Sequence, residues 1–425
     1  MARHINTNCV QAGYEPKAGE ARVLPIYQST TFKYESSEQM GKLFDLEAEG
    51  YFYTRLQNPT NDAVAAKIAA LEGGTAAMLT SSGQAANFYA MFNICNAGDH
   101  IVSSAAIYGG TFNLLGVTMK KMGIDVTFVD PDCTAEELEA AFQENTKVLF
   151  AESISNPSMV VLDFEKFAAA ANKHGVPFIV DNTFPTPVNC RPLELGAHIV
   201  THSTTKYMDG HATSVGGAII EGGTFDWMAH KEKYPMMTEP DDSYHGLVYS
   251  EAFGPTAFIT KATAQVMRDL GSIPSPHNAF LLNIGLETLF LRMERHCFNA
   301  QKVAEFLEAD ERITWVEYPG LESSKYHERA NKYMPNGTCG VVSFGVKGGR
   351  EAATKFMDSL KLAAIVTHVA DARTCVLHPA STTHRQLSDK QLEEAGVAPD
   401  LIRLSVGIEY FEDIIEDIKQ ALEQI

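Results

Sequence analysis

Short apolar runs alternate with alanine-rich amphipathic segments over the first half of the chain, and this alternation restricts the fold more than any other feature. The runs predict strands at 77–80, 100–104, 126–129, 147–152, 176–180 and 198–202, and the segments between them predict helices at 61–71, 134–143 and 164–174. Repeated strand–helix–strand units favour a mostly parallel sheet with helices on both faces. The chain is therefore expected to contain an α/β domain.

Polar side chains follow several of these expected strands. They are Tyr108, Asn156, Asp181, Ser203, Thr205 and Lys206. In open parallel sheets, ligands bind beyond the carboxyl ends of the strands. Each residue alone is a weak signal, but all six share one expected location, so the sequence predicts a single site at that edge of the sheet.

Lys206 lies among hydroxyl residues directly after the last of these strands. The strand would hold the backbone while the loop exposes the amine, which suits a lysine that forms a Schiff base with a carbonyl compound. A single lysine is more often a solvated charge. Asp181, 25 positions earlier at another strand end, strengthens the case, although a lone aspartate there could equally cap a helix or a turn.

Together these residue types match what pyridoxal phosphate requires. Lys206 offers the amine for the aldehyde, and the Asp181 carboxylate could keep the pyridine nitrogen protonated. Tyr108 could stack on the ring, or be an ordinary packed loop aromatic. Arg403, on a later predicted strand, could bind a substrate carboxylate bidentately, or form a surface ion pair.

A phosphate cradle is expected after the strand 77–80. A turn of small residues, Ser81 to Gly83, leads there into a helix that ends near Cys95. Free N–H groups and the helix dipole make such an N-terminus an anion site, although many helices begin this way without a ligand. The backbone amides of Gly83 and Gln84, with the hydroxyls of Ser203 and Thr205, are the candidate phosphate ligands.

The remaining parts of the chain show other residue patterns. Residues 1–60 form an aperiodic, aromatic-rich arm that could lie against a second subunit or be a surface loop, and 61–275 form the cofactor-binding domain. Within that domain, 225–275 is expected to be an inserted, mostly irregular covering segment. A long helix from about Asn278 should link to a smaller C-terminal α+β domain, 276–425, with strands at 313–317, 340–346 and 401–409 and helices at 350–360 and 411–424.

Composition excludes several classes of function. The net charge of −19 argues against a nucleic-acid partner and against binding to anionic lipid. No apolar run approaches the roughly 18 residues of a membrane helix, and the N-terminus resembles no signal peptide. The seven cysteines form no C-x-x-C pair, and His174, His198 and His202 have no carboxylate or cysteine at ligand spacing, so no metal site is expected. These features predict a cytoplasmic protein.

The motifs resemble those of the transsulfuration family, the pyridoxal-phosphate enzymes of cysteine and methionine metabolism. The matches run through nearly the whole chain in the family's order: YTRLQNPT at 53–60, SSG at 81–83, YGGT at 108–111, ES at 152–153, NP at 156–157, VDNTF at 180–184, STTKY at 203–207 and RLSVG at 403–407. Within the family the chain is most similar to the O-acetylhomoserine sulfhydrylase branch, through YGGT, GHATSVGG at 210–217, SYHGL at 243–247, NAFLL at 278–282 and the insertion.

This resemblance implies a fold-type I transferase with a mostly parallel seven-stranded sheet, assembled as a homotetramer from dimers. It assigns Lys206 to the Schiff base, Asp181 to the pyridine nitrogen, Asn156 to the ring hydroxyl, Tyr108 to stacking and proton transfer, and Arg403 to the substrate carboxylate. Tyr53 and Arg55 of the arm are expected to reach the phosphate of the neighbouring subunit. His368 departs from the family, whose members usually carry smaller or amide residues there.

The implied reaction is a γ-replacement in methionine biosynthesis: acetate leaves O-acetylhomoserine and sulfide takes its place, giving homocysteine. γ-Elimination as in methionine γ-lyase, use of a succinyl or phospho group, and use of another thiol as in cystathionine γ-synthase remain open. Gly110 weighs against the lyase, which usually has a cysteine there. A non-catalytic binding role is a further alternative, against which Lys206 and Asp181 argue.

Overall fold

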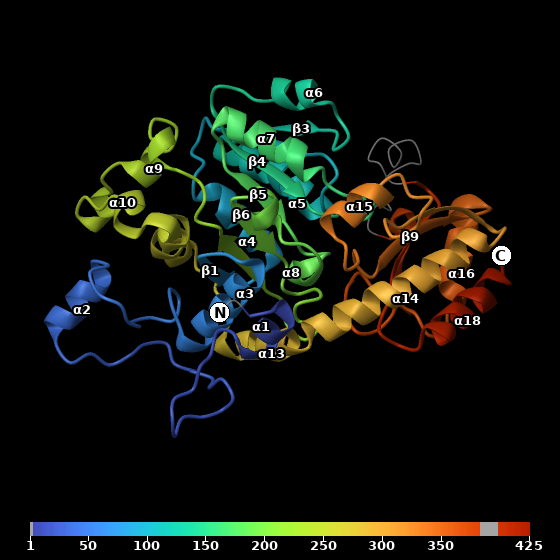
Figure 1. The fold of residues 1–425 in the computed structure, drawn as a ribbon, viewed down its shortest axis with the longest axis horizontal. Helices are drawn as coiled ribbons and strands as arrows, with labels where there is room; N and C mark the ends of the chain where they lie inside the picture. The colour runs from blue at the N-terminus through green and yellow to red at the C-terminus, as the bar shows by residue number, and fades with distance from the viewer. Residues whose placement is uncertain (1–2, 383–397) are drawn as a thin grey trace.

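A computed structural model describes residues 3–382 and 398–425, and its larger part is built on one seven-stranded sheet (Figure 1). The strands are β1 Ala76–Thr80, β2 His100–Ser104, β3 Asp125–Val129, β4 Thr146–Glu152, β5 Phe178–Asp181, β6 Ile199–His202 and β7 Gly217–Glu221. Their order is β1-β7-β6-β5-β4-β2-β3. Strands β2 to β6 are mutually parallel, and β7 runs antiparallel to both of its neighbours. The predicted mostly parallel α/β sheet is confirmed.

Helices cover both faces of this sheet because its strands are apolar on both sides. In β5 the side chains of Phe178 and Val180 pack into one apolar cluster with helices α3 Pro59–Glu72 and α7 Phe164–His174. Ile179, between them, points into the cluster on the other face with α4 Gly83–Phe92. Such doubly buried strands are typical of parallel sheets. They leave the carboxyl ends of the strands as the open edge.

Strand β7 was missed by the sequence analysis. It lies between β1 and β6 and begins at Gly217, where an added Cβ would come within 2.3 Å of the Ser82 carbonyl oxygen. The two glycines at 216 and 217 weaken the strand signal, yet the close approach requires a residue without a side chain. This contact brings the turn before α4 against the sheet.

The linking segment is two helices, whereas one long helix was expected. Helix α13 Pro276–Glu287 stops at Thr288, and α14 Leu289–Ala309 crosses from the large sheet to the small one (Figure 1). Buried Arg292 accounts for the junction: its guanidinium donates to the carbonyls of Gly285 and Tyr207, both at 2.6 Å. The arginine thereby caps α13 and ties it to the loop that follows Lys206.

The smaller domain is a five-stranded sheet in the order β10-β11-β12-β9-β8. Its strands are β8 Ile313–Glu317, β9 Val341–Val346, β10 Ala364–Ile365, β11 Cys375–Leu377 and β12 Leu401–Ser405. Helices α16 Gly349–Ser359 and α18 Phe411–Leu422 pack with α14 into its core. The predicted α+β character is confirmed, while β10, β11 and α15 His327–Tyr333 were not foreseen.

The insertion is helical, so the expectation of a mostly irregular segment was wrong. It consists of short helices: η4 Met228–His230, α9 Pro235–Thr238, η5 Asp242–Tyr244, α10 Tyr249–Phe253, η6 Gly254–Thr256, α11 Ala257–Lys261, η7 Ala262–Met267 and α12 Arg268–Leu270. Glu221, at the end of β7, accepts hydrogen bonds from the amides of Phe258 and Ile259 at the start of α11. Helices α11, η7 and α12 follow one another without a break over residues 257–270, and the π-helical turns of η7 interrupt the 3.6-residue period there.

The N-terminal arm contains two short helices, α1 Ile5–Gln11 and α2 Ser37–Phe44, joined by irregular chain. Helix α1 packs on α3, whereas α2 lies out beside the insertion, away from the large sheet (Figure 1). The remaining helices are α5 Gly109–Asn113, η1 Leu114–Thr118, η2 Met119–Met122, α6 Ala135–Ala140, α8 Thr186–Asn189, η3 Pro192–Leu195 and η8 Pro379–Ser381.

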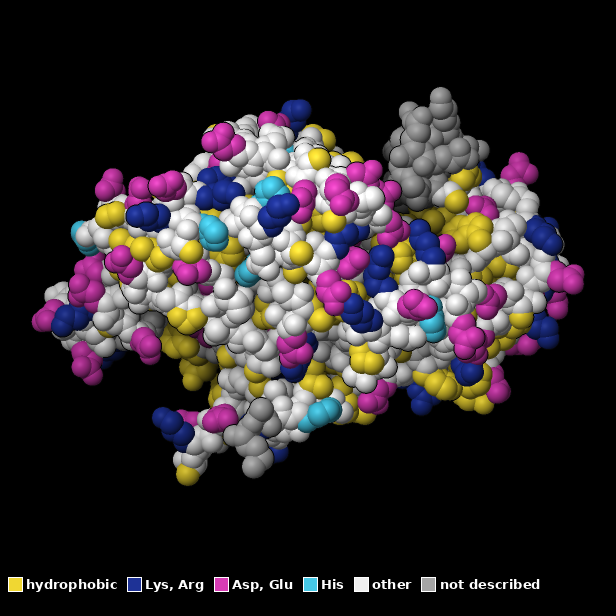
Figure 2. All heavy atoms as spheres, turned by 45° about the horizontal axis from the view of Figure 1, so that its top comes forward, with side chains coloured by type: hydrophobic (Ala, Val, Ile, Leu, Met, Phe, Trp, Pro, Cys, Tyr) yellow, Lys and Arg dark blue, Asp and Glu magenta, His cyan; other side chains and the backbone are white. Residues whose placement is uncertain are grey.

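The surface agrees with the composition. Figure 2 shows acidic side chains spread over one whole face with basic ones between them, as expected for a net charge of −19. In the part of the chain that the structure describes, no helix has the length and apolar character needed to cross a bilayer.

Candidate active site

A cavity of about 250 Å³ opens at the carboxyl edge of the large sheet, next to the smaller domain. The predicted site residues that line this cavity are Gly83, Gln84, Tyr108, Asn156, Asp181, Ser203, Thr205, Lys206 and Arg403. The predicted convergence at the strand ends is thus seen in the structure. Tyr53 and Arg55 are absent from this cavity.

Lys206 follows β6 in a tight turn, in which its amide donates to the Ser203 carbonyl. Burial, and secondarily the charge of Arg403, lowers the pKa of the Lys206 amine to about 8. Among the described residues its Nζ has no hydrogen-bond partner. A weakly basic amine facing a cavity is the form that reacts with an aldehyde. The protein's own groups produce this lowering.

Asp181, the last residue of β5, is buried and held on both carboxylate oxygens. Thr183 donates to Oδ1 from its amide at 3.0 Å and from its hydroxyl at 2.5 Å, and Asn87 of α4 donates to Oδ2 at 3.1 Å. These donors fix the orientation of the carboxylate. Asn87 and Thr183 were not identified from the sequence, although a threonine two residues after an aspartate is a typical Asx-turn pattern.

The turn before α4 offers a site for an anion. Ser82 caps the helix through the Ala85 amide, and in the described chain the amides of Gly83 and Gln84 have no acceptor. A Cβ at Gly83 would lie 2.6 Å from the Ser203 Cβ, so only glycine allows the helix start to approach the β6 loop this closely. Two free amides and the helix dipole together suit a phosphate.

Thr205 lines the cavity, but its hydroxyl is engaged within the protein. Its hydroxyl donates to the Gly216 carbonyl at 3.1 Å and accepts from the Gly216 amide at 3.1 Å. Because the one hydroxyl proton is already used, Thr205 braces the loop against the segment before β7. Ser203, by contrast, uses its amide to bond the Thr183 hydroxyl at 2.9 Å, which leaves its own hydroxyl for a ligand.

Arg403 on β12 brings the smaller domain into the site. Its Nη1 donates to the Asn156 side-chain oxygen at 3.2 Å, and its Nη2 donates to the carbonyls of Thr367 and His368 at 3.3 and 3.2 Å. The guanidinium is buried and its Nε has no partner in the described chain. A buried arginine with an unused N–H beside a cavity can bind a carboxylate.

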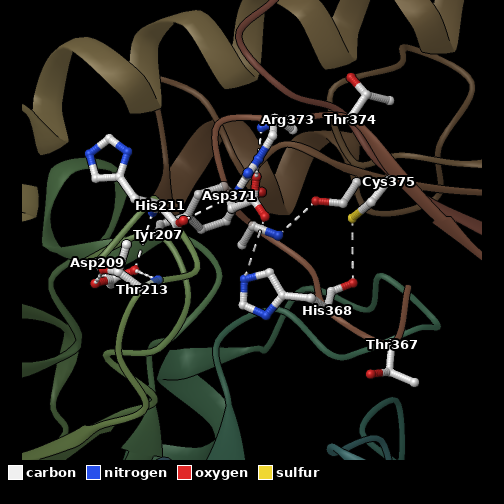
Figure 3. Close-up of polar contacts among 12 residues, drawn as sticks. Tyr207, Asp209, His211, Thr213, Thr367, His368, Asp371, Arg373, Thr374 and Cys375 are labelled. Carbon is white, nitrogen blue, oxygen red and sulfur yellow. Dashed lines mark hydrogen bonds and ion pairs between the residues drawn. The ribbon is translucent and has the colours of Figure 1, made fainter. Parts of the chain in front are cut away.

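His368, the residue that departs from the family, supplies a carbonyl to Arg403 but turns its ring toward Asp371 (Figure 3). The two side chains are 3.9 Å apart, and the ring does not line the cavity. Burial, and secondarily the positive charge of Lys206, lowers the pKa of His368. The same segment is tied to the loop after Lys206, where Arg373 bonds the His211 carbonyl (Figure 3).

The arm residues line a different cavity, of about 960 Å³. Tyr53 and Arg55 lie there with the alanine face of α3 and with Tyr244 and Arg268 of the insertion. Arg55 is exposed, its guanidinium stacks 5.3 Å from the Tyr53 ring, and Nη1 donates to the Arg268 carbonyl. Within one chain the insertion therefore borders this second cavity, and none of its described residues lines the cavity at Lys206.

The family and the relatives that match this chain cover nearly its whole length. Residues 6–423 match the family described as Cys/Met metabolism PLP-dependent enzyme. The chain is 45% identical to the homocysteine/cysteine synthase of Saccharomyces cerevisiae, over all of this chain and 99% of that protein. It is also 45% identical to the O-acetyl-L-homoserine sulfhydrylase of Leptospira meyeri, over 99% and 96% of the two chains.

Solved structures are similar as well. A Campylobacter jejuni protein described as an O-acetylhomoserine (thiol)-lyase, with N'-pyridoxyl-lysine-5'-monophosphate in its chain, superposes with a TM-score of 0.95 at 38% identity, covering 99% of this chain and all of that one. The metB protein of Corynebacterium glutamicum superposes with a TM-score of 0.83 at 36% identity, over 99% and 98% of the two chains.

Proposed function

This chain belongs to the family of Cys/Met metabolism PLP-dependent enzymes, and we propose that it converts O-acetyl-L-homoserine and sulfide to L-homocysteine and acetate. The observation that carries the proposal is the cavity that brings Lys206, Asp181 and Arg403 together beside the free N-terminus of α4. Proteins named for this chemistry resemble the chain over its whole length. The reaction belongs to methionine biosynthesis.

The cavity has the donors that pyridoxal 5'-phosphate requires. The amides of Gly83 and Gln84 and the Ser203 hydroxyl would hold the phosphate, and the Asp181 carboxylate would pair with the ring nitrogen. Asn156 would bond the ring hydroxyl and Tyr108 would cover the ring face. When bound, the cofactor supplies an electron sink for the charge that develops at Cα and then at Cβ of the amino acid.

The protein's own groups perform the remaining tasks. The Arg403 guanidinium binds the substrate carboxylate and so orients the Cα–H bond. The neutral Lys206 amine would take the Cα proton, and a second proton would pass from Cβ to a basic group of the site before acetate departs from Cγ with the electrons of the Cγ–O bond. Sulfide then bonds to Cγ, and protons return to Cβ and Cα. Because the pKa of Lys206 is about 8, part of the amine is neutral at physiological pH.

Gly110 supports replacement over elimination. A Cβ at this position would lie 2.4 Å from the Tyr108 Cε1, so the ring position seen here leaves no room for a side chain at 110. Position 110 consequently supplies no thiol that could reprotonate the substrate and promote its release. The substrate then remains bound until a nucleophile arrives.

A product assay tests the proposal. We expect O-acetylhomoserine with sulfide to give homocysteine at least about tenfold faster than methionine gives oxo acid, a difference of about 1.4 kcal/mol. Parallel assays with O-succinyl- and O-phosphohomoserine, O-acetylserine and methanethiol define the acyl group, the amino acid and the nucleophile. Oxo acid from methionine at an equal or higher rate would assign the chain to the lyases.

The assembly is part of the same proposal. The protein is a cytoplasmic homotetramer built from two dimers, and in each dimer Tyr53 and Arg55 extend to the phosphate of the neighbouring subunit. What supports this is their position at the second cavity, outside the cavity of their own chain. Light scattering of the purified protein should give the mass of four chains of 46.5 kDa.

A further inference from the structure

Glu152 is a buried carboxyl group that the reaction as described leaves without a role. It ends β4, pairs in register with Asp181 at the end of β5, and lines the same cavity. Its side chain is 7% exposed. Two carboxyl groups on adjacent parallel strands point to the same side of the sheet. Glu152 therefore lies beside the acid assigned to the ring nitrogen.

The contacts of Glu152 reach two other site residues through their backbones. Its Oε1 accepts a hydrogen bond from the Tyr108 amide at 2.6 Å, and the Asn156 amide lies near enough to the carboxyl group to lower its pKa. Both amides belong to residues whose side chains line the cavity, although they come from different loops. One carboxyl group thus holds the loop after β2 and the loop after β4 together.

The connection continues into the smaller domain. The side-chain oxygen of Asn156 accepts from Arg403 Nη1 at 3.2 Å. Moving the Asn156 backbone would therefore move an acceptor of the arginine assigned to the substrate carboxylate. Tyr108, in contrast, is 49% exposed and begins the five-residue helix α5 without a side-chain cap. The bond from its amide to Glu152 fixes its position together with the bonds that its carbonyl accepts from the Thr111 and Phe112 amides.

The surroundings of Glu152 destabilise its ionised form. Burial, and secondarily the negative charge of Asp181, raises the pKa of Glu152, and the two amide donors offset only part of this rise. Removing a carboxyl group from water beside another carboxylate is costly. A neutral glutamine fills a similar volume without this cost, but its single carbonyl oxygen cannot take the place of two carboxyl oxygens.

We propose that Glu152 is a positioning residue for the sulfhydrylase reaction, holding Tyr108 over the cofactor ring and Asn156 against Arg403 through their backbone amides. The inference rests on the proposed function, because it concerns the roles assigned there to Tyr108 and Arg403. The proposal adds Glu152 as one buried side chain on which two residues depend: Tyr108, which covers the ring, and Arg403, which binds the substrate carboxylate.

Glu152→Gln tests this proposal. The amide can accept from one of the two N–H groups and presents its own donor to the other, so one loop loses its anchor. We expect KM for O-acetylhomoserine to rise or kcat to fall by about tenfold, with a matching weakening of cofactor binding measured by fluorescence titration. Unchanged KM, kcat and cofactor affinity would overturn the proposal.

Glu221→Gln is the matched control. Glu221 is also a buried strand-end glutamate of the large sheet that accepts two backbone amides, but it lies outside the cavity. This variant should lose stability and keep the kinetic constants. Glu152→Asp keeps the charge on a side chain shorter by one methylene and should not restore activity. Full activity in the aspartate variant would show that charge, and not reach, is what matters.

A measurement on the unaltered protein covers the case in which Glu152→Gln fails to fold. The Tyr108 amide should exchange with deuterium slowly, as a buried hydrogen-bonded group does, although its side chain is half exposed. Fast exchange at Tyr108 in the holoenzyme would refute the positioning role. Homocysteine synthesis by the same preparation reports separately on the proposed function, so the two failures remain distinguishable.

Discussion

The cavity at Lys206 and the cavity at the arm differ in how completely one chain builds them. Around the first, of about 250 Å³, Asp181 and Arg403 are each held by several hydrogen bonds from the same chain. Around the second, of about 960 Å³, Tyr53 and Arg55 are exposed. A site whose groups are locked in place is ready for chemistry, whereas exposed aromatic and cationic groups beside a wide cavity are open to contact with another surface.

This contrast separates two kinds of site residue. Lys206, Asp181 and Arg403 should matter within their own subunit. Tyr53 and Arg55 should matter to a neighbouring subunit, if the proposed dimer forms. Variants of the first group and variants of the second group should therefore behave differently in assemblies that mix two kinds of subunit. The following predictions test that difference.

The largest effect is expected at Lys206. Lys206→Met should lower kcat by a factor on the order of 10³ or more, because both the cofactor amine and the base for the Cα proton are lost. Borohydride should fix the cofactor to Lys206 in the yellow unaltered enzyme, as read by peptide mapping. Lys261→Met is the control, since the Lys261 amine is also buried with its pKa lowered to about 8 but lies outside the cavity. A label on any other residue would refute the assignment.

Arg55→Ala should have the next largest effect. Losing a charge-assisted contact to phosphate should weaken cofactor affinity by roughly 10- to 100-fold, although Arg55 is absent from the cavity at Lys206. Mixing Arg55→Ala subunits with Lys206→Ala subunits should restore part of the activity, because a hybrid dimer contains one intact site. If verified hybrids stay inactive, the arm serves its own subunit and the contrast between the cavities fails.

The pH dependence of cofactor capture should show a smaller effect. Only the neutral amine attacks the aldehyde, and burial with the charge of Arg403 lowers the pKa of Lys206 from 10.5 to about 8. The rate at which the apoenzyme binds pyridoxal phosphate should therefore rise with pH and level off above about 8. In Arg403→Leu the midpoint should move up, because one of the two causes is removed. A midpoint near 10 in the unaltered protein would contradict the buried amine.

Thr205 should give the smallest effect. Thr205→Val removes two hydrogen bonds to Gly216 and should lower the free energy of unfolding by about 1–3 kcal/mol while leaving cofactor affinity within a few-fold. Thr205→Ser keeps the hydroxyl and should remain close to the unaltered protein. Ser203→Ala should show the reverse pattern, with weaker cofactor binding and little loss of stability. Strong loss of cofactor in Thr205→Val would restore Thr205 to the phosphate site.

Much of the site could be predicted because its residues follow strands. Strands of a parallel sheet end at one edge, so Asp181 and Lys206 could be brought together by counting strands alone. Glu152 follows the same rule, and the sequence analysis even included it in a motif, but nothing in a sequence shows that a carboxyl group faces two backbone amides. Asn87 was missed because it lies on a helix and reaches Asp181 only through tertiary packing.

The sequence by itself determined the alternation of strands and helices, the two-part architecture and the main chemical groups, because periodicity and turn residues are local properties of the chain. Tertiary structure decided what depends on distance between remote segments. It inserted the glycine-led strand β7 between β1 and β6, engaged the Thr205 hydroxyl with Gly216, and directed the arm and the insertion to a cavity other than that of Lys206. Such pairings depend on which surfaces remain open once the sheet has formed, and no local pattern records them.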